Sequence, residues 1–126
     1  GKVNGKVIGV DSDQQPVIDG KYGEGMTITS AMKGLSATVN TILNDIRDGK
    51  WSEHAGKIEN LGMVSENPEE NYVQLPIKST QWSDAFTEED YRALVKGMYN
   101  GEIKVSNDIS AMPSTTVKVT DYGSIK

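Results

Sequence analysis

Residues 7–14 read VIGVDSDQ, an apolar run that ends in acidic side chains, and residues 26–33 read MTITSAMK. A short apolar run followed by turn residues is typical of a buried strand, and the helical spacing of the apolar residues that follow predicts an amphipathic helix. We expect residues 15–25, which contain Pro16 and three glycines, to form the loop between them. These segments together predict a strand–loop–helix unit of an α/β sheet.

Two charged side chains are expected at the ligand-binding edge of this sheet. Asp11 follows the apolar run, and ligands of open α/β sheets bind beyond the carboxyl ends of the strands. Ser30 is a suitable N-cap for the helix, which would place Lys33 in the first turn, where the helix dipole disfavours a cation. An acceptor opposite Lys33 would explain this charge, so we expect Asp11 and Lys33 to frame one polar pocket. Taken alone the pair is a weak signal, because strands often end in Asp and surface lysines keep their charge in water.

The composition limits the possible functions. With 126 residues the chain is long enough for one domain with its own core. A net charge of −5 argues against a nucleic-acid surface, and no apolar run approaches the length of a membrane span. The chain has no Cys and a single histidine, His54, which excludes disulfides, cysteine-ligated zinc and paired-histidine metal sites. These absences predict no metal site built on Cys or on paired His, and we expect no catalytic residue, no metal and no cofactor in this chain.

Periodicity and capping predict the remaining elements. One helix is expected from about Ala31 to Asp48, ended by Gly49, and a second from Thr87 to residues 100–101, with Thr87 and Asp90 spaced like a capping box. Alternating residues predict strands over 57–64, 72–77, 103–105 and 115–122, with a turn over 65–71 and a loop over 106–114. The apolar stripes expected to be buried are Leu35, Val39, Ile42, Leu43 and Ile46 on the first helix, and Tyr91, Leu94, Val95 and Met98 on the second.

Five segments, in order along the chain, resemble one protein family. GVDSDQ at 9–14, TSAMKG at 29–34, DGKW at 48–51, ENLG at 59–62 and NGEIKV at 100–105 are similar to segments of the basic membrane protein family. Members of this family are substrate-binding lipoproteins of ABC transporters and include purine-nucleoside receptors. Each segment is weak evidence by itself. The resemblance rests on the fact that all five occur in the same order as in the family.

The resemblance implies a type I periplasmic-binding-protein fold, a doubly wound α/β fold whose two lobes close over a ligand. The chain would be only its C-terminal part. Residues 1–64 would supply a strand, helix and strand of the second lobe, and residues 65–126 the hinge crossing, a helix and the final strands. The polar opening contains no signal peptide, and we expect the lipid-anchoring Cys and the N-terminal lobe to lie outside this chain.

The implied function is solute binding and not catalysis. The parent protein would be the extracellular binding component of an ABC importer, at the outer face of the cell membrane or in the periplasm, with the transporter permease as its partner. By the resemblance, Asp11 and Lys33 match positions that bond polar groups of the ligand, chiefly the ribose of a purine nucleoside. A carboxylate can accept charge-assisted hydrogen bonds from two neighbouring hydroxyls. Further ligand-binding candidates are Asp13, Gln14, Thr29 and Ser30.

An enzymatic alternative is a haloacid-dehalogenase-like phosphotransferase. Asp11 and Asp13 after a hydrophobic strand fit its pattern, in which the first Asp attacks phosphorus and the second handles the leaving group. Thr29 or Ser30 together with Lys33 could imitate its later phosphate-binding residues. Against this assignment, a Gln stands two positions after the second Asp where Thr or Val is usual, and no acidic pair for Mg²⁺ follows on a later strand end.

A third possibility keeps the fold and changes the role. Type I lobes also serve as sugar-sensing domains of transcription repressors, although nothing basic or helix-turn-helix-like is present in this sequence. A lobe without its partner would expose the hinge surface. We therefore expect the isolated chain to lack measurable ligand binding, and we expect it to aggregate or to swap with a second copy.

Overall fold

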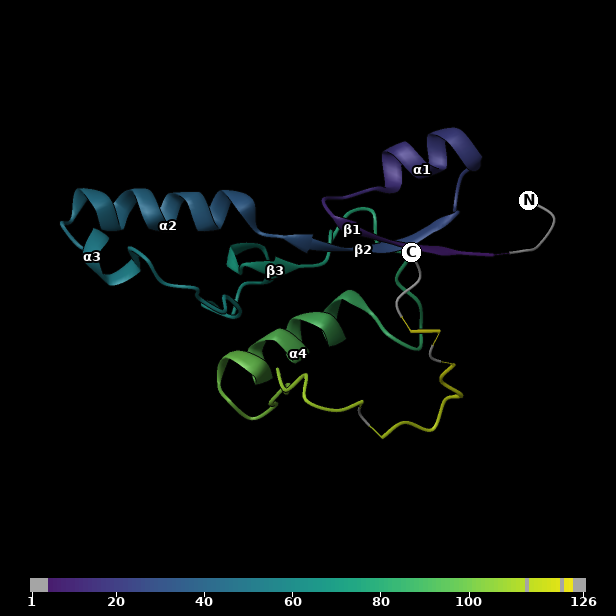
Figure 1. The fold of residues 1–126 in the computed structure, drawn as a ribbon. Helices are drawn as coiled ribbons and strands as arrows, with labels where there is room; N and C mark the ends of the chain where they lie inside the picture. Colours follow the sequence, from purple (N-terminus) through teal and green to yellow (C-terminus); the bar gives the residue numbers. More distant parts are fainter. Residues whose placement is uncertain (1–4, 113, 121, 124–126) are drawn as a thin grey trace.

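A three-stranded mixed sheet organises the fold (Figure 1). The computed structural model describes residues 5–112, 114–120 and 122–123. Its strands are β1 (Val7–Asp11), β2 (Thr27–Lys33) and β3 (Val73–Gln74), in the order β1-β2-β3. β1 and β2 run parallel, whereas β3 pairs antiparallel with the end of β2. The chain is thus a small α/β domain, as its sequence predicts.

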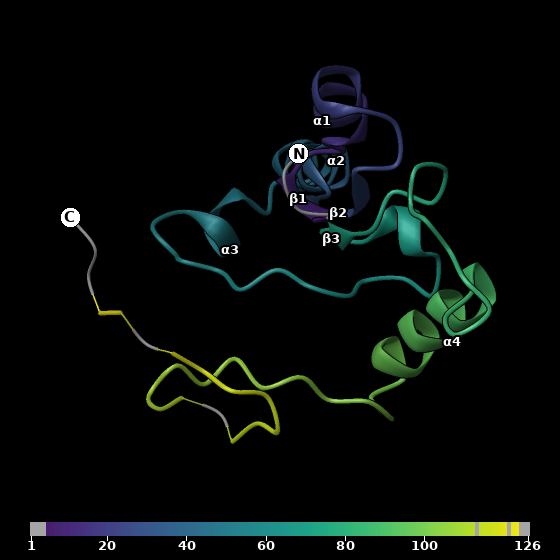
Figure 2. The same cartoon turned by 90° about the vertical axis from the view of Figure 1, so that its right-hand side faces the viewer.

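The connection from β1 to β2 is a helix, α1 (Gln15–Tyr22), which covers one face of the sheet (Figure 2). The sequence predicts a loop in this region, and that prediction is wrong. Pro16 lies in the first turn of α1, where a missing N–H is tolerated because that group has no acceptor within the helix. The segment from β1 to β2 is therefore a complete βαβ unit.

Asp19 of α1 ties this helix to the start of β2. Its buried carboxylate accepts hydrogen bonds from the backbone N–H groups of Gly25 (2.9 Å) and Thr27 (2.8 Å) and from Nε2 of Gln15 (3.1 Å). Burial alone would raise the pKa of this carboxyl, but the hydrogen bonds outweigh it and lower the pKa to about 2. The charged form of Asp19 is therefore part of the folded structure.

The first predicted helix is confirmed as α2 (Leu35–Arg47), but it begins later than expected. Ser30 and Lys33 belong to β2, so the predicted N-cap at Ser30 and the predicted first-turn position of Lys33 are both wrong. Pairing with β1 explains the difference, because the parallel register continues through Ala31 and Met32 up to the start of β3 pairing. Gly34 is the N-cap instead, and no side chain caps the helix.

The apolar stripe of α2 is exposed, contrary to the prediction. Figure 1 shows α2 running away from the sheet, with the short helix α3 (Trp51–His54) folded beneath its far end. Gly49 between the two helices has a φ of 77°, so its predicted role in ending α2 is confirmed. Ile42 is half-buried. The residues of the stripe that are 48–61% exposed are Leu35, Val39, Leu43 and Ile46.

Most of the predicted strands do not form. Residues 57–64, 103–105 and the described part of 115–122 are irregular, and position 121 lies outside the described residues. Of 72–77 only β3 is a strand, and the predicted turn over 65–71 contains a short 3₁₀ helix, η1 (Pro68–Glu70). Alternation makes a segment suitable for a sheet, but a strand forms only when a neighbouring strand supplies its hydrogen bonds.

The second predicted helix is confirmed as α4 (Glu88–Tyr99). The capping box is present: Oγ1 of Thr87 accepts from the Asp90 N–H (3.1 Å), and Oδ2 of Asp90 accepts from the Thr87 N–H (2.8 Å). Tyr91 and Val95 are buried, and the ring of Trp82 stacks on Tyr91 with 5.6 Å between centroids. Leu94 and Met98 are half-buried, and the helix ends at Asn100 before Gly101, which has a φ of 76°.

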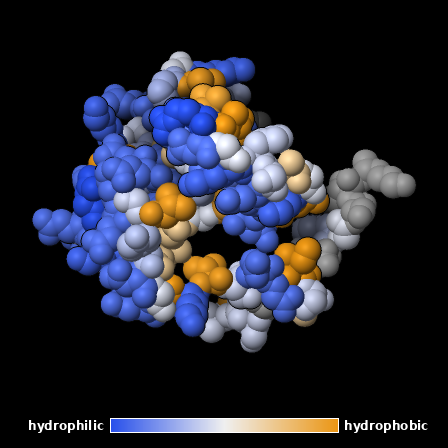
Figure 3. Space-filling view, turned by 90° about the vertical axis from the view of Figure 1, so that its left-hand side faces the viewer, coloured by the Kyte–Doolittle hydropathy of each residue, from blue (hydrophilic) through white to orange (hydrophobic). Residues whose placement is uncertain are grey.

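Much of the chain is open to solvent. Its accessible surface is 10,026 Å², whereas a compact monomer of 13.7 kDa exposes about 6,600 Å². Figure 3, which looks at the molecule from the α2–α3 end, shows apolar residues at the surface around an opening. Within the described part of the chain, the helices are too short or too polar to span a bilayer.

Candidate functional site

The carboxyl ends of β1 and β2 lie at the same edge of the sheet because the two strands are parallel. Asp11 is the last residue of β1 and Lys33 is the last residue of β2. Nζ of Lys33 lies 2.6 Å from Oδ1 of Asp11. The structure thus brings together the two residues that we expected to frame one polar pocket, although Lys33 comes from a strand end and not from a helix. Of the two, only Lys33 lines the pocket found beside them.

The backbone at Asp11 is unusual. Its φ is 83°, and it is the one non-glycine residue with positive φ in the described part of the chain. Aspartate tolerates this conformation better than most residues because its short polar side chain can bond locally. Such strain costs about 1–3 kcal/mol and is concentrated at functional sites. The strand therefore ends in a sharp turn at the residue that carries the candidate carboxylate.

The ion pair between Asp11 and Lys33 contributes little to stability. The two side chains are 61% and 69% exposed, and exposed pairs of this kind contribute about 0–1 kcal/mol. Among the described residues, the second carboxylate oxygen and the remaining ammonium hydrogens have no further partner. These groups are therefore available to an external polar ligand.

A pocket of about 370 Å³ lies beside Lys33, between the β2–α2 junction and the segment around β3. It offers donors at Lys33 and acceptors at Glu69. The first turn of α2, which also lines it, has backbone N–H groups without an acceptor in the helix and no capping side chain. Gln74 lines the other wall, but its side chain already donates to the carbonyls of Glu69 and Asn71 (2.8 Å each).

Asp13 has its oxygens engaged within the protein. Oδ1 accepts from the Gln15 N–H (3.1 Å) at the start of α1, and Oδ2 accepts from Oγ of Ser79 (2.6 Å). Ser79 is far along the chain, so Asp13 holds the segment after β3 against the βαβ unit. In this structure the side chain holds other elements in place, and Asp13 is also among the residues that line a second pocket, of about 530 Å³.

Ser30 and Gln14 are engaged in the same way. Oγ of Ser30, which is fully buried, accepts from the Gln14 N–H (3.1 Å), and the Gln14 side chain donates to Oγ of Ser12 (3.1 Å). Gly9 is required beside them, because a Cβ at this position would lie 2.6 Å from both Ser30 Oγ and Gln14 Cβ. These contacts close the turn between β1 and α1.

Thr29 bonds to the segment that follows β3. Its Oγ1 lies 2.7 Å from Oγ1 of Thr80, which donates its own hydrogen to the Pro76 carbonyl (2.6 Å). Each hydroxyl has one hydrogen, so Thr29 is the donor in the contact between the two threonines. Of the six candidate residues, only Asp11 and Lys33 are exposed, whereas the other four are half-buried or buried.

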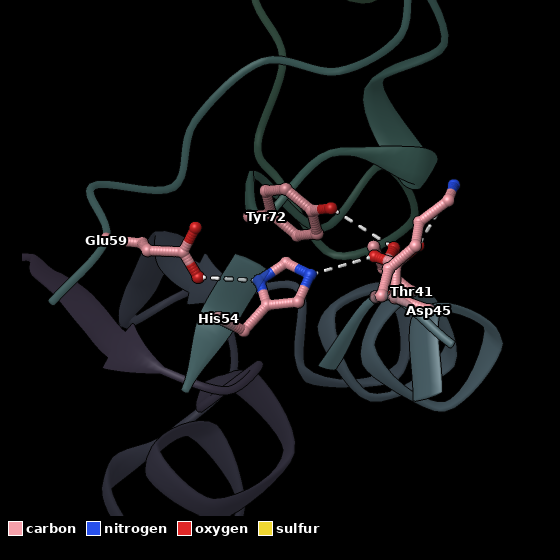
Figure 4. A network of polar contacts seen from close by, with 7 residues as sticks. Thr41, Asp45, His54, Glu59 and Tyr72 are labelled. Carbon is pink, nitrogen blue, oxygen red and sulfur yellow. Dashed lines mark hydrogen bonds and ion pairs between the residues drawn. The ribbon is translucent and has the colours of Figure 1, made fainter. Parts of the chain in front are cut away.

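The sequence analysis missed a polar network around His54, at the far end of α2 (Figure 4). Nδ1 of His54 lies 2.8 Å from Oε2 of Glu59, and Nε2 lies 3.1 Å from Oδ2 of Asp45. Both carboxylates can only accept, so the doubly protonated ring satisfies both contacts. The hydrogen bond with Glu59 and then that with Asp45 raise the pKa of His54. Lys50 lies 3.7 Å from the other oxygen of Asp45.

The network joins α2, α3 and the irregular segment after α3. Beside it, the hydroxyl of Tyr72 donates to Oγ1 of Thr41 (3.1 Å), which connects α2 to the start of β3. The partners of His54 lie nine residues before it and five residues after it, spacings that match neither a helix nor a strand. No pattern in the sequence could therefore have revealed this cluster.

In the described residues, no group of three or more His, Cys, Asp or Glu side chains is placed to hold a metal ion. Comparison with protein-family models, with curated proteins and with solved structures finds no match to this chain. The site is therefore interpreted from its own geometry and chemistry.

Proposed function

We propose that this chain is part of a two-lobed solute-binding protein with type I periplasmic-binding-protein architecture, and that Asp11 and Lys33 bind a polyhydroxylated ligand. The observation that carries the proposal is the 2.6 Å pair that these residues form at the joined carboxyl ends of two parallel strands. Ligands of open α/β sheets bind at this edge.

The chemistry of the pair suits a neutral ligand with neighbouring hydroxyls. Asp11 can accept from two hydroxyls, and Lys33 can donate to an ether or hydroxyl oxygen. Because the two charges compensate each other, a neutral ligand can cover them without leaving an unpaired buried charge. A ribose has these groups, so a purine nucleoside is the ligand class we propose.

The proposed parent protein is the binding component of an ABC importer and not an enzyme. It would act at the outer face of the cell membrane, held by a lipid anchor outside this chain, or in the periplasm. Its partners would be the transporter permease and the N-terminal lobe of the same protein. Closure of that lobe over Asp11 would exclude water and strengthen its hydrogen bonds to the ligand.

Calorimetry tests the proposal on the complete two-lobed protein, with guanosine, adenosine, inosine and ribose as ligands. We expect a nucleoside to bind, and Asp11→Ala to weaken binding by about 10- to 150-fold, the effect of one charged hydrogen bond. Asp84→Ala, which removes another exposed carboxylate, is the matched control and should bind normally. If no nucleoside or sugar binds, the ligand class is wrong. If binding survives Asp11→Ala, the receptor assignment stands but the site does not.

The phosphotransferase alternative has less support from the geometry. Asp13 would have to exchange a proton with the leaving group, yet both of its oxygens already accept hydrogen bonds from Gln15 and Ser79. A phosphatase assay in the presence of Mg²⁺ separates the two functions, because a binding protein turns over no phosphate ester. A sugar-sensing lobe would share the fold and the pair, and would bind ribose or another sugar more tightly than any nucleoside.

A further inference from the structure

Residues 57–61, which we call the strap, are held to the rest of the fold by very few contacts. All five residues are exposed, and the side chain of Ile58 is fully so. Among the described residues, the bond between Glu59 and His54 is the one side-chain hydrogen bond that the strap makes. A segment with so few contacts opens at a low free-energy cost, so the position of the strap depends on this one bond.

The chain is fixed again on either side of the strap. Before it, Gly56 has a φ of 73°, and the Lys57 N–H donates to the carbonyl of His54 (3.1 Å). After it, the carbonyl of Gly62 accepts from the Tyr72 N–H (3.2 Å). The strap also forms the near wall of a pocket of about 620 Å³, whose apolar lining residues are Leu61, Met63, Val73, Met98, Ile103 and Val105. A movement of the strap would therefore change the opening of this pocket.

The ring of His54 can hold both of its partners only while both of its nitrogens carry hydrogen. Figure 4 shows the ring between Glu59 of the strap and Asp45 of α2. Neutral imidazole has one N–H. Loss of a proton therefore leaves one carboxylate facing a ring nitrogen that can no longer donate to it.

Glu59 is the carboxylate that can leave the ring. Asp45 is held in α2, its side chain is 21% exposed, and Lys50 lies 3.7 Å from its other oxygen. The side chain of Glu59 is 39% exposed and belongs to an irregular segment, and in the described part of the chain no cation other than His54 reaches it. From the side of β3, the hydroxyl of Tyr72 already donates to Thr41 and offers Glu59 no replacement.

We propose that His54 is a pH-sensitive switch that controls the position of the strap. The doubly protonated ring binds Glu59 and keeps the strap beside α3. When the ring loses a proton, Glu59 turns into water and the strap moves, which opens the apolar pocket on this side. The bond with Glu59 and then that with Asp45 raise the pKa of the ring above its ordinary value of 6.5, so release takes place on the alkaline side of that value.

NMR of the 126-residue chain, labelled at the methyl groups of Ile and Leu, tests the switch. Methyl signals remain visible at alkaline pH, where amide signals fade. We expect the signals of Ile58 and Leu61 to shift with the same midpoint as the His54 ring, whereas Ile18 of α1 should not follow that midpoint. A ring that stays protonated, or a ring that titrates while Ile58 and Leu61 stay unchanged, overturns the proposal.

Glu59→Gln separates a switch from a purely structural contact. The new amide can accept from a protonated Nδ1 and donate to an unprotonated one, so the strap should stay in place at every pH. Glu53→Gln, which removes another exposed carboxylate beside His54, should keep the pH-dependent shift of the parent chain. If the methyl signals of Glu59→Gln shift as in the parent chain, or if both variants lose the shift, the proposal is overturned.

Limited proteolysis measures the movement itself. Trypsin cleaves after lysine, and cleavage of a transiently opened segment follows the population of the open form. Cleavage after Lys57, taken relative to cleavage after the exposed Lys118, should increase in the parent chain as His54 loses its proton. The ratio should stay constant in Glu59→Gln. A constant ratio in the parent chain would show that the strap does not move, and would overturn the proposal.

Discussion

Replacing Asn71 by alanine tests how the irregular half of this fold is held together. Asn71 is fully buried between η1 and β3. Its Oδ1 accepts from the N–H groups of Val64 (2.6 Å) and Ser65 (2.9 Å), and its Nδ2 donates to the carbonyls of Ser65 (3.0 Å) and Asn67 (3.1 Å). One side chain thus satisfies four backbone groups of a turn that has few hydrogen bonds of its own.

The expected cost follows from these four contacts. Each intramolecular hydrogen bond contributes about 0.5–1.5 kcal/mol, which gives about 2–6 kcal/mol for the set. Water can recover part of this, because Val64 and Asn67 are exposed and the turn lies at the surface. We therefore expect Asn71→Ala to lower the free energy of unfolding by about 2–4 kcal/mol. Asn71→Asp should cost at least as much, because it places a carboxylate oxygen against the two carbonyls.

Urea unfolding, followed by tryptophan fluorescence and circular dichroism, measures this change, and the slope with urea should stay the same in all variants. Asn60→Ala is the matched control: Asn60 is exposed in the same irregular segment, and its loss should change the free energy of unfolding by less than about 0.5 kcal/mol. If Asn71→Ala costs no more than this control, the four contacts do not stabilise the fold and the reasoning is refuted.

Three further predictions concern pH dependence and backbone fit. The pKa of Asp19 is about 2 in the folded protein, below its ordinary value of 3.8. The ionised carboxylate therefore stabilises the fold fully above pH 3.8, and this stabilisation is lost as the pH falls towards 2. In urea unfolding, Asp19→Asn should have a lower free energy of unfolding at neutral pH, and this free energy should depend less on pH between 2 and 3.8. The pKa of His54 is raised above its ordinary value of 6.5, so the charged ring stabilises the fold fully below pH 6.5, and this stabilisation is lost as the pH rises through the folded pKa. NMR titration of this single histidine should show the raised pKa, and Glu59→Gln should lower the pKa of His54. An ordinary pKa in the unsubstituted chain would contradict the network. In thermal unfolding, Gly34→Ala should destabilise because its Cβ would overlap the backbone. At Gly20, inside α1, a Cβ would lie in open space, so Gly20→Ala should raise the free energy of unfolding by about 0.5–1 kcal/mol. If Gly34→Ala and Gly20→Ala change the stability equally, the backbone overlap at Gly34 is not a real constraint.

The elements that the sequence predicts well are those specified by local chemistry. The capping box of Thr87 and Asp90 defines the start of α4 within a few residues of chain, and Gly49 and Gly101 mark helix ends by their positive φ. No distant contact is needed to form these features. Local signals of this kind therefore predict both helices, the C-terminal end of each and the start of α4, but not the start of α2.

The errors arise where distant parts of the chain decide the structure. Ser30 as an N-cap predicts a helix that includes residues 31–33, yet these residues extend β2 because β1 and β3 lie beside them. Residues 57–64 and 103–105 alternate as strands do, but they find no partner strand among the described residues. The stripe of α2 has the period of a buried face, and no periodicity shows whether a second surface is present to bury it.

The Asp11–Lys33 pair was predicted from a partly wrong structure, and the reason is geometric. The prediction placed Lys33 at a helix start, whereas it ends a strand, but both positions lie at the carboxyl edge of a parallel sheet, where Asp11 also lies. The pairing of β1 with β2 ends at this edge, and the side chains of Asp11 and Lys33 are exposed there. His54 and Asn71 are the opposite case, because their roles depend on carboxylates and backbone groups that irregular segments bring to them. The residues most open to a ligand can thus be found from strand order alone, whereas the residues that hold the irregular half together become visible only in three dimensions.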